Sequence, residues 1–364
     1  MSPSNDPIAA VSQRLDTFLS GQRTSTADLG PDARLLTDAA ARSLTGGKGL
    51  RGRFCVAGWR AVASADRPAG DPPAEVVTAA AALEIFQAAA LVHDDLVDNS
   101  DTRRGRPSAH RALEQTHRDL GWSGDAAAFG RSAAILLGDL LVAWSDDLLE
   151  EAAATASADR GASARARYAT MRREVTIGQF LDVAEESAFR TAPDDEHAAR
   201  ALRVASLKSA RYSIQQPLAI GAALAGADDA QQAALAAFGH PLGIAFQLRD
   251  DVLGVFGDQA RTGKPSGDDL REGKRTVLVA YAREALAPTA RRIVDELLGD
   301  RDLDAEQIAS LQRTIVDTGA LERVEQLIAD SAREAERALS GARLGNAAVG
   351  DLRDLARAAT VRVA

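Results

Sequence analysis

The sequence has little cysteine, few aromatic residues and no excess of basic charge. Its 364 residues include one cysteine, which rules out a disulfide framework within the chain and is typical of a reducing compartment. Aromatic residues make up 4%, and the formal net charge of -9 argues against general nucleic-acid binding. We therefore expect no nucleic-acid partner, and we expect Cys55 to be a small buried hydrophobic residue.

Two further features are lacking, a targeting signal and a membrane-spanning run. Residues 1–7 contain neither a basic segment nor an apolar one, so we expect a disordered tail there and no signal peptide. The longest apolar stretch, residues 133–144, is interrupted by Gly138 and Asp139 and is shorter than the roughly 20 apolar residues that span a bilayer. We expect a cytoplasmic protein with no membrane span.

Helical periodicity dominates what is present. Apolar residues recur three and four positions apart, and almost no segment alternates with period two. Helices are expected over residues 31–43, 126–155 and 163–188, with residues 157–161 as a connection, and Pro217 is expected to kink a later helix. We predict an all-α fold, with residues 1–364 forming a single large helical bundle around a central cavity.

An acidic segment closes one of the most apolar helices. Residues 76–92 are followed by His93 and then by Asp94, Asp95 and Asp98. Asp94 and Asp98 share a helix face and repel each other, so a cation should neutralise them. All-oxygen ligands favour Mg²⁺ bound by one or two carboxylates plus substrate phosphates, which leaves His93 a supporting or core role. A solvated acidic helix end is the alternative interpretation.

A second acidic pair repeats this context. Asp250 and Asp251 close the apolar stretch 242–248, and two such helix ends could face each other across a cavity and bind a diphosphate through several Mg²⁺ ions. Metal ions and cationic side chains stabilise a departing diphosphate, which makes ionisation of an allylic diphosphate feasible in a dry pocket. The cations available for this are Lys48, Arg51, Arg103, Arg104, Lys208, Lys264 and Lys274.

These motifs occur in an order that resembles the trans-isoprenyl diphosphate synthases of the polyprenyl synthetase family, of the short-chain kind typified by farnesyl and geranylgeranyl diphosphate synthases. The match covers nearly the whole chain: Gly46-Gly47-Lys48-x-x-Arg51, Asp94-Asp95-x-x-Asp98 with Arg103-Arg104-Gly105-x-Pro107, Gly138-Asp139, Gly178-Gln179-x-x-Asp182, Lys208-Ser209-x-x-Tyr212, Phe246-Gln247-x-x-Asp250-Asp251, Thr262-Gly263-Lys264 and Gly273-Lys274. The resemblance implies a helical bundle of the isoprenoid synthase type. It also implies a homodimer, with the helix over residues 126–155 as the candidate interface.

The resemblance also implies a role for each matching residue. Three Mg²⁺ ions would be held by Asp94 and Asp98 with help from Asp182, and by Asp250, with Asp95 and Asp251 close by. The allylic diphosphate would be gripped by Arg103, Lys208 and Lys264, with Lys274 among the substrate-binding residues. Isopentenyl diphosphate would be held by Lys48, Arg51 and Arg104, with Gln87 as a neutral donor. Gln247, Lys208 and Ser209 would lie beside the developing carbocation, so the expected catalytic set is Lys208, Gln247, Asp94, Asp98 and Asp250.

The function this implies is Mg²⁺-dependent, head-to-tail condensation of isopentenyl diphosphate with dimethylallyl, geranyl or farnesyl diphosphate. Ala89 and Ala90 lie one turn before the acidic motif, where similar enzymes that stop early often place bulky aromatics. We therefore expect geranylgeranyl diphosphate as the product, with Phe86 as the floor of the pocket. A farnesyl or longer polyprenyl product is the alternative. Separately, Ala89 and Ala90 could be packing residues in an alanine-rich chain.

The sequence departs from the family pattern at Gly254, where many members carry a third Asp, and at Gly49 and Gly52 in the first basic loop. Two other functional classes are weighed. A terpene cyclase would need an Asn/Asp-x-x-Ser/Thr-x-x-x-Glu motif on a later helix, which the sequence does not contain. A non-catalytic regulatory subunit would have lost its metal ligands, whereas both Asp pairs persist.

Overall fold

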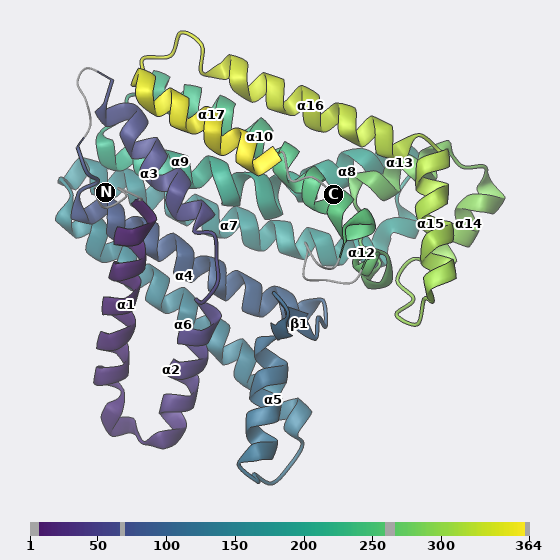
Figure 1. Cartoon of the computed structure of the whole chain (residues 1–364), viewed down its shortest axis with the longest axis horizontal. Coiled ribbons are helices and arrows are strands. Elements are labelled where there is room, and N and C mark those ends of the chain that lie inside the picture. Colours follow the sequence, from purple (N-terminus) through teal and green to yellow (C-terminus); the bar gives the residue numbers. More distant parts are fainter. Residues whose placement is uncertain (1–6, 66–69, 259–265, 361–364) are drawn as a thin grey trace. The chain divides into compact units, whose positions relative to one another are not determined.

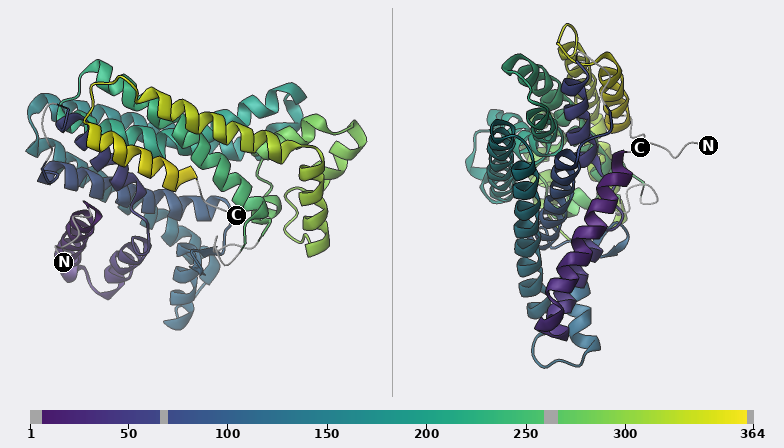
Figure 2. Two further views of the ribbon diagram at one scale, coloured as in Figure 1. Left: turned by 45° about the horizontal axis from the view of Figure 1, so that its top comes forward. Right: turned by 90° about the vertical axis from the view of Figure 1, so that its left-hand side faces the viewer.

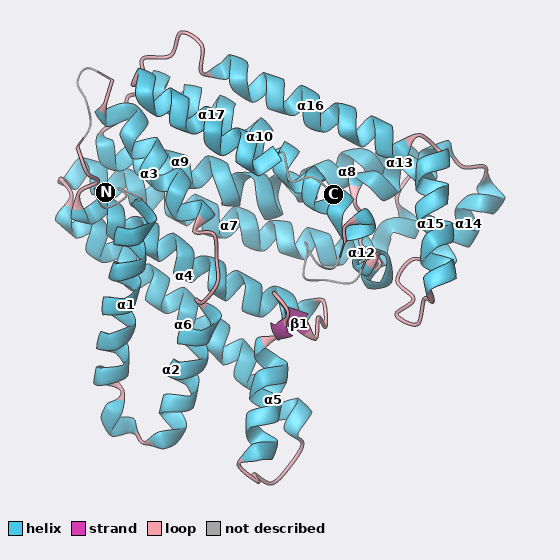
Figure 3. Ribbon diagram, in the orientation of Figure 1, coloured by secondary structure: helices cyan, strands magenta, loops and turns pink. Residues whose placement is uncertain are grey.

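The structure is a computed structural model that describes residues 7–65, 70–258 and 266–360 (Figure 1). Helices make up nearly all of it (Figure 3), so the all-α prediction is confirmed. Two short strands, β1 (Thr102–Arg103) and β2 (Arg106–Pro107), pair antiparallel. The chain forms two compact units, residues 1–166 with 220–227 and residues 167–219 with 228–364. The single domain over 1–364 stays a prediction.

The first unit is built around two long apolar helices. Besides β1 and β2 it contains α1 (Pro7–Ser25), η1 (Ala27–Leu29), α2 (Pro31–Ser43), α3 (Leu50–Ala63), α4 (Ala74–Val97), α5 (Ala109–Asp119) and α6 (Ala126–Thr155). α4 packs against α6, where Ser145 Oγ donates a hydrogen bond of 2.7 Å to Ala82 O. Most alanines of α4 are buried, and small side chains let the helices approach closely. α6 begins as predicted because the Asp125 carboxylate accepts hydrogen bonds from Ala127 N and Ala128 N.

Cys55 lies where α3 meets a later segment of the first unit. A Cβ on Gly221 would lie 2.8 Å from the Cys55 carbonyl carbon, so only glycine fits at this contact. The Cys55 thiol is fully buried, and burial raises its pKa to about 12.

The hydrophobic core of the second unit includes residues of α10 (Asp229–Phe256) on either side of Asp250 and Asp251. It contains most of α7 (Ala158–Ala188) and the start of α9 (Gln216–Ala225), with η2 (Phe189–Thr191), η3 (Asp194–Glu196), α8 (His197–Val204), the π-helix η4 (Ala205–Gln215), α10 (Asp229–Phe256), α12 (Asp268–Glu272), α13 (Val277–Ala285), α14 (Pro288–Leu297), α15 (Ala305–Asp317), α16 (Ala320–Ala338) and α17 (Asn346–Thr360). α16, yellow-green in Figure 2, packs against α10.

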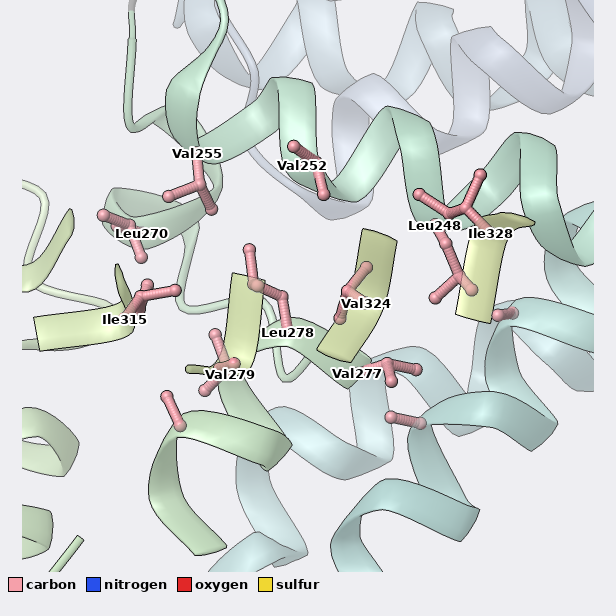
Figure 4. Close-up of a cluster of buried hydrophobic side chains, with 14 of the residues drawn as sticks. Leu248, Val252, Val255, Leu270, Val277, Leu278, Val279, Ile315, Val324 and Ile328 are labelled. Atoms are coloured by element: carbon pink, nitrogen blue, oxygen red, sulfur yellow. The ribbon is translucent and has the colours of Figure 1, made fainter. Parts of the chain in front are cut away.

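The close-up of Figure 4 shows the cluster of buried side chains that α10 shares with its neighbours: Leu248, Val252 and Val255 of α10 with Leu270, Val277, Leu278, Val279, Ile315, Val324 and Ile328. Because these residues anchor one face of α10, its acidic end is held by a packed core.

Two sequence-based expectations need revision. The connection predicted at residues 157–161 is wrong beyond Ser157, because α7 begins at Ala158. Gly161 is a helical residue whose missing side chain lets α7 approach the Ala153 carbonyl closely. The expected kink at Pro217 takes the form of a widened helix, the π-helical segment η4, which ends two residues before it.

Two helices are long and apolar enough to cross a membrane by length and composition alone, α4 and α6. Core helices of soluble proteins pass the same test, and 67% of the α4 window is buried inside the protein, against 33% for α6. Two such helices are weak support for a membrane protein, and the absence of a membrane span stays a prediction.

Candidate functional site

The first acidic cluster, defined as Asp94, Asp95 and Asp98, lies at the C-terminal end of α4, where Asp98 is the C-cap. Arg103 Nη2 lies 2.5 Å from Asp95 Oδ1 and 3.3 Å from Asp94 Oδ2. Asp95 is buried and Asp94 is half-buried, so these charge-assisted hydrogen bonds are partly shielded from solvent. The structure therefore brings Asp94 and Asp95 into direct contact with Arg103, the residue predicted to bind the allylic diphosphate.

A tight hairpin brings Arg103 back onto the helix end. Arg104 and Gly105, between β1 and β2, both have positive φ, of 54° and 71°. Positive φ at both central residues is typical of the type I′ turn, which matches the twist of two paired strands. The loop that the sequence shows only as basic is thus an ordered hairpin.

The residues predicted to hold isopentenyl diphosphate gather at the start of α3. Arg104 Nη1 donates to Thr45 O at 3.2 Å, in the loop that carries Lys48. Burial lowers the pKa of Arg104, and the neighbouring charges of Arg103 and Arg51 lower it further. The guanidinium groups of Arg51 and Arg104 near the N-terminus of α3 favour an anion there.

Glu84 and Gln87 extend this group from α4. Glu84 Oε1 accepts a hydrogen bond of 2.8 Å from Gly52 N and thereby satisfies one backbone donor in the first turn of α3. Gln87 lies one helical turn further along α4, on the side of Glu84. α4 thus carries both the first acidic cluster and the neutral donor predicted beside isopentenyl diphosphate.

The proposed chain-length residues lie in the buried part of α4. Phe86 and Ala89 are buried, and Ala90 is partly buried. The ring of His93 lies against α6, because a Cβ on Gly138 would fall 2.6 Å from its Cε1 atom, and its Nε2 atom lies 3.3 Å from Ile135 O. His93 therefore contributes to the α4–α6 contact.

In the second unit, Asp182 of α7 is the centre of an ion-pair group. Lys208 Nζ lies 2.5 Å from Asp182 Oδ2, and Lys274 Nζ lies 3.4 Å from the same oxygen. Lys274 Nζ also lies 3.2 Å from Glu186 Oε1. Ser209, the neighbour of Lys208, is buried. The structure thus brings together three residues that the sequence predicted, and it adds Glu186, one turn after Asp182, which sequence reasoning missed.

The second acidic cluster, defined as Asp182, Asp250, Asp251 and Asp269, brings four carboxylates close enough for three of them to repel the charge of Asp251. Burial raises the pKa of Asp251 well above its ordinary value, and repulsion from Asp269, Asp250 and Asp182 raises it further. A hydrogen bond of 2.6 Å from Gln247 Nε2 to Asp251 Oδ1 opposes this shift. A buried carboxylate among other carboxylates fits a site that takes a divalent cation.

Asp269 is the second residue that sequence reasoning missed. A Cβ on Gly254 would lie within 3.0 Å of the carboxylate atoms of Asp269, 2.7 Å from Oδ1. The Asp269 carboxylate therefore occupies the space beside the position at which many members of the family carry their third Asp. The available signal was the Asp268-Asp269 pair itself, which follows the second motif in a polar segment.

Neither Lys264 nor a complete metal-binding group can be placed among the described residues. Lys264 is outside the described residues. Within the described part of the chain, no three His, Cys, Asp or Glu side chains are close enough to hold a metal ion on their own. An ion bound to either acidic cluster would take part of its coordination shell from the substrate or water, as Mg²⁺ usually does.

The family model for polyprenyl synthetase matches residues 33–315. The chain belongs to the polyprenyl synthetase family. The resemblance inferred from the motifs is thereby confirmed.

Individual relatives agree with this assignment. The short-chain isoprenyl diphosphate synthase of Methanocaldococcus jannaschii is 31% identical over 234 residues, covering 64% of each protein. The geranylgeranyl diphosphate synthase of Mycobacterium tuberculosis is 36% identical over 226 residues, covering 62% of this chain and 57% of that protein. The matches thus span less than two thirds of the length of these curated relatives.

The chain also matches solved structures almost end to end. The geranylgeranyl pyrophosphate synthase from Corynebacterium glutamicum, complexed with isoprenyl diphosphate and magnesium, is 39% identical. The alignment has a TM-score of 0.90 and covers 98% of each chain.

Proposed function

We propose that this member of the polyprenyl synthetase family is a prenyltransferase that condenses isopentenyl diphosphate with an allylic diphosphate, head to tail. The observation that carries the proposal is the pairing of carboxylates and cations in both units. Arg103 contacts Asp94 and Asp95, and Lys208 and Lys274 contact Asp182. In each unit, a metal-bound phosphate offers new partners to these groups, since phosphate oxygens bind the cations and the metal ion binds the carboxylates.

Mg²⁺ is the ion that we propose for both acidic clusters, with three ions in all. The ligands would be Asp94, Asp98, Asp182 and Asp250, with Asp95 and Asp251 nearby. Support comes from the all-oxygen donor set, and the related Corynebacterium glutamicum structure is described as a complex with magnesium. When bound, the ions stabilise the negative charge that develops on the departing diphosphate.

The chain's own residues have separate tasks in this proposal. Arg103 and Lys208 hold the allylic diphosphate, together with Lys264. Gln247 donates through Nε2 to Asp251, so its amide oxygen is the end left to face a substrate. The oxygen is the negative end of the Gln247 amide dipole, which stabilises a carbocation without a full negative charge that would react with it.

Isopentenyl diphosphate is assigned to the cationic group at the start of α3. Lys48 offers a compact ammonium group, and Arg51 and Arg104 offer planar guanidinium groups that can donate two hydrogen bonds to one phosphate. The first turn of α3 adds backbone N–H groups. Glu84, the acidic residue whose charge acts on Arg104, is engaged with Gly52 N. A diphosphate held without metal keeps its ester bond, as the second substrate must.

Geranylgeranyl diphosphate is the product that we propose. The small side chains of Ala89 and Ala90 leave room one turn before the first acidic cluster, and Phe86 is the proposed floor. Replacing Ala89 with Phe should shift the product to a shorter chain, measured by chromatography of the dephosphorylated products. An unchanged product would remove Ala89 from this role, and a mainly farnesyl product from the natural protein would correct the chain length alone.

A homodimer in the cytoplasm is also proposed. On α6 the side chains of Ile135 and Leu136 are 48% and 60% exposed, which is unusual for two adjacent large apolar residues. A second copy of the chain would cover them. The cytoplasmic location is supported by the single buried thiol and the acidic net charge.

The test of the function is incubation of the purified protein with Mg²⁺, labelled isopentenyl diphosphate and each allylic starter. We expect elongation with at least one starter and its loss on chelation of the metal. Asp98→Asn should lower kcat by roughly 10²-fold or more, because a metal ligand is lost. Arg353→Ala on the exposed face of α17 is the control and should leave the rate unchanged. Absence of elongation with every starter would refute the proposal and favour the regulatory-subunit alternative.

A further inference from the structure

The segment that carries Lys208 has an unusual backbone. η4 is π-helical over 11 residues, Ala205–Gln215. At its end the N–H of Gln216 bonds to the carbonyl of Arg211, five residues earlier. π-Helical turns are rare and occur frequently at functional sites. Something must therefore hold this segment in a wider turn than its sequence would adopt alone.

Pro217 accounts for part of this geometry. Proline has no N–H, and in a regular α-helix its ring would clash with the carbonyl four residues before it, at Ser213. A widened turn just before Pro217 relieves that clash. It does not explain why the π-helical segment extends back to Ala205, beyond Lys208.

α7 supplies a row of contacts along the segment. Glu174, Gly178 and Asp182 lie four residues apart and so share one helix face. Glu174 Oε1 lies 2.5 Å from Arg211 Nη1, and Asp182 Oδ2 lies 2.5 Å from Lys208 Nζ. Between these two ion pairs, α7 and the segment touch at Gly178.

The contact at Gly178 is made by backbone. A Cβ there would lie 2.7 Å from the Leu207 carbonyl carbon and 2.8 Å from Lys208 Cα. Both distances are shorter than real Cβ contacts, and backbone atoms cannot rotate away as the end of a side chain can. A methyl group at this position would therefore displace the backbone of Lys208 itself.

α10 touches the same segment through glycine. A Cβ on Gly243 would lie 2.5 Å from Ala210 Cα, and one on Gly239 would lie 2.9 Å from Gln215 Cα. His240, between them, has its Nε2 atom 2.8 Å from Ser206 Oγ. The segment is thus held by backbone contact on two helices, which leaves it little room to absorb a displacement.

We propose that Gly178 and the Glu174–Arg211 pair are positioning elements, which fix the backbone of Lys208 against α7 so that its ammonium group reaches Asp182 and, with substrate bound, the allylic diphosphate. The inference rests on the proposed function of Lys208. Gly178 and Glu174 touch no substrate in this scheme and act through Lys208. A displacement of about 1 Å is enough to cost roughly 10²-fold in rate when a catalytic group is misplaced.

The first test compares Gly178→Ala with Gly350→Ala. Gly350 lies within α17, and the position that a Cβ would take there has no neighbouring atom within 4 Å, so it controls for the glycine-to-alanine change. Binding of an unreactive allylic thiolodiphosphate with Mg²⁺ is measured by calorimetry, and KM and kcat are measured for both substrates. We expect Gly178→Ala to weaken binding of the allylic analogue about tenfold or more, to raise the allylic KM, and to change the KM for isopentenyl diphosphate less than about twofold. Gly350→Ala should match the natural protein.

Equal losses for both substrates, or no loss in Gly178→Ala, would overturn the inference. If Gly178→Ala does not fold, as judged by circular dichroism, the Glu174–Arg211 pair gives a second test. Glu174→Arg and Arg211→Glu should each weaken binding of the allylic analogue, and the double variant should recover most of it. Failure of the double variant to recover would overturn the inference. A natural protein that elongates no starter would refute the proposed function instead, while the binding measurements still judge the positioning of Lys208.

Discussion

Restoring the third acidic residue of the second motif should harm this protein. In the Gly254→Asp variant, the new Cβ would overlap the Asp269 carboxylate, whose atoms all lie within 3.0 Å of that position. Forcing Asp269 off its rotamer costs about 0.5–1.5 kcal/mol. Two carboxylates about 4 Å apart repel by about 4 kcal/mol at an effective dielectric constant of about 20, and solvent at this partly exposed position reduces that figure. We expect the free energy of unfolding without metal to fall by about 2–4 kcal/mol.

Two variants separate the steric and electrostatic parts of this loss. Gly254→Ala has the same steric demand but gains about 1 kcal/mol of helix propensity, so its net effect should be close to zero. Combining Gly254→Asp with Asp269→Asn removes the repulsion and should recover most of the stability, which a double-mutant cycle measures.

Urea denaturation followed by circular dichroism is the assay, with and without Mg²⁺. Added Mg²⁺ should narrow the difference between Gly254→Asp and the natural protein, because a divalent cation screens the extra charge. A Gly254→Asp protein as stable as the natural one in metal-free buffer of low ionic strength would refute the reasoning.

Two further predictions concern the first unit. Leu136→Asp on α6 should convert the proposed dimer into monomers, as measured by analytical ultracentrifugation. Leu29→Asp, at a position that is also well exposed but lies on η1, should leave the dimer intact. A dimer that survives Leu136→Asp would exclude this face of α6 as the dimer interface. The buried thiol of Cys55 should lower the free energy of unfolding in alkali, because its pKa in the folded protein is about 12 and its ordinary pKa is 9.0. Above pH 9 the unfolded chain loses this proton while the folded protein keeps it. The stabilising contribution of the thiol is therefore fully present below pH 9 and is lost as the pH rises toward 12, by about 1.4 kcal/mol per pH unit. Urea denaturation at pH 8 and 10 should show this loss in the natural protein and not in Cys55→Ala, and equal losses in both would contradict it.

The sequence predicted those parts of the fold whose signals are local. α2 begins at Pro31 and α6 follows Asp125 as expected, because a proline at the first helical position and an N-cap carboxylate act on adjacent backbone groups. Gly161 belongs to the connection expected at residues 157–161, whereas in the structure it lies within α7 and packs against the backbone of Ala153. Whether a glycine ends a helix or packs within one depends on a partner that is distant along the chain or on the next helix, which spacing does not show.

The same limit applies to the candidate site. The acidic motifs and cations were found because their residue types and spacing are themselves the signal. Pro217 signals an irregular helix, but the extent of the π-helical segment around Lys208 was not predictable, because spacing does not show the close contacts that Gly178 and Gly243 make with it from other helices. Asp269 was missed because its relation to Gly254 exists only in three dimensions.

The ion pairs of the two acidic clusters have a consequence for selectivity. Arg103, Lys208 and Lys274 all contact carboxylates of the acidic clusters. A phosphate that binds one of these cations without a metal ion draws it away from an aspartate and weakens the neutralisation of that carboxylate, and a metal ion that binds the carboxylate without a phosphate weakens the neutralisation of the cation. Only a ligand that delivers anion and metal together lets every charge exchange partners at once. Under the proposed function, this need for matched charge would favour a metal-bound diphosphate over a simple phosphate before the hydrocarbon chain is recognised.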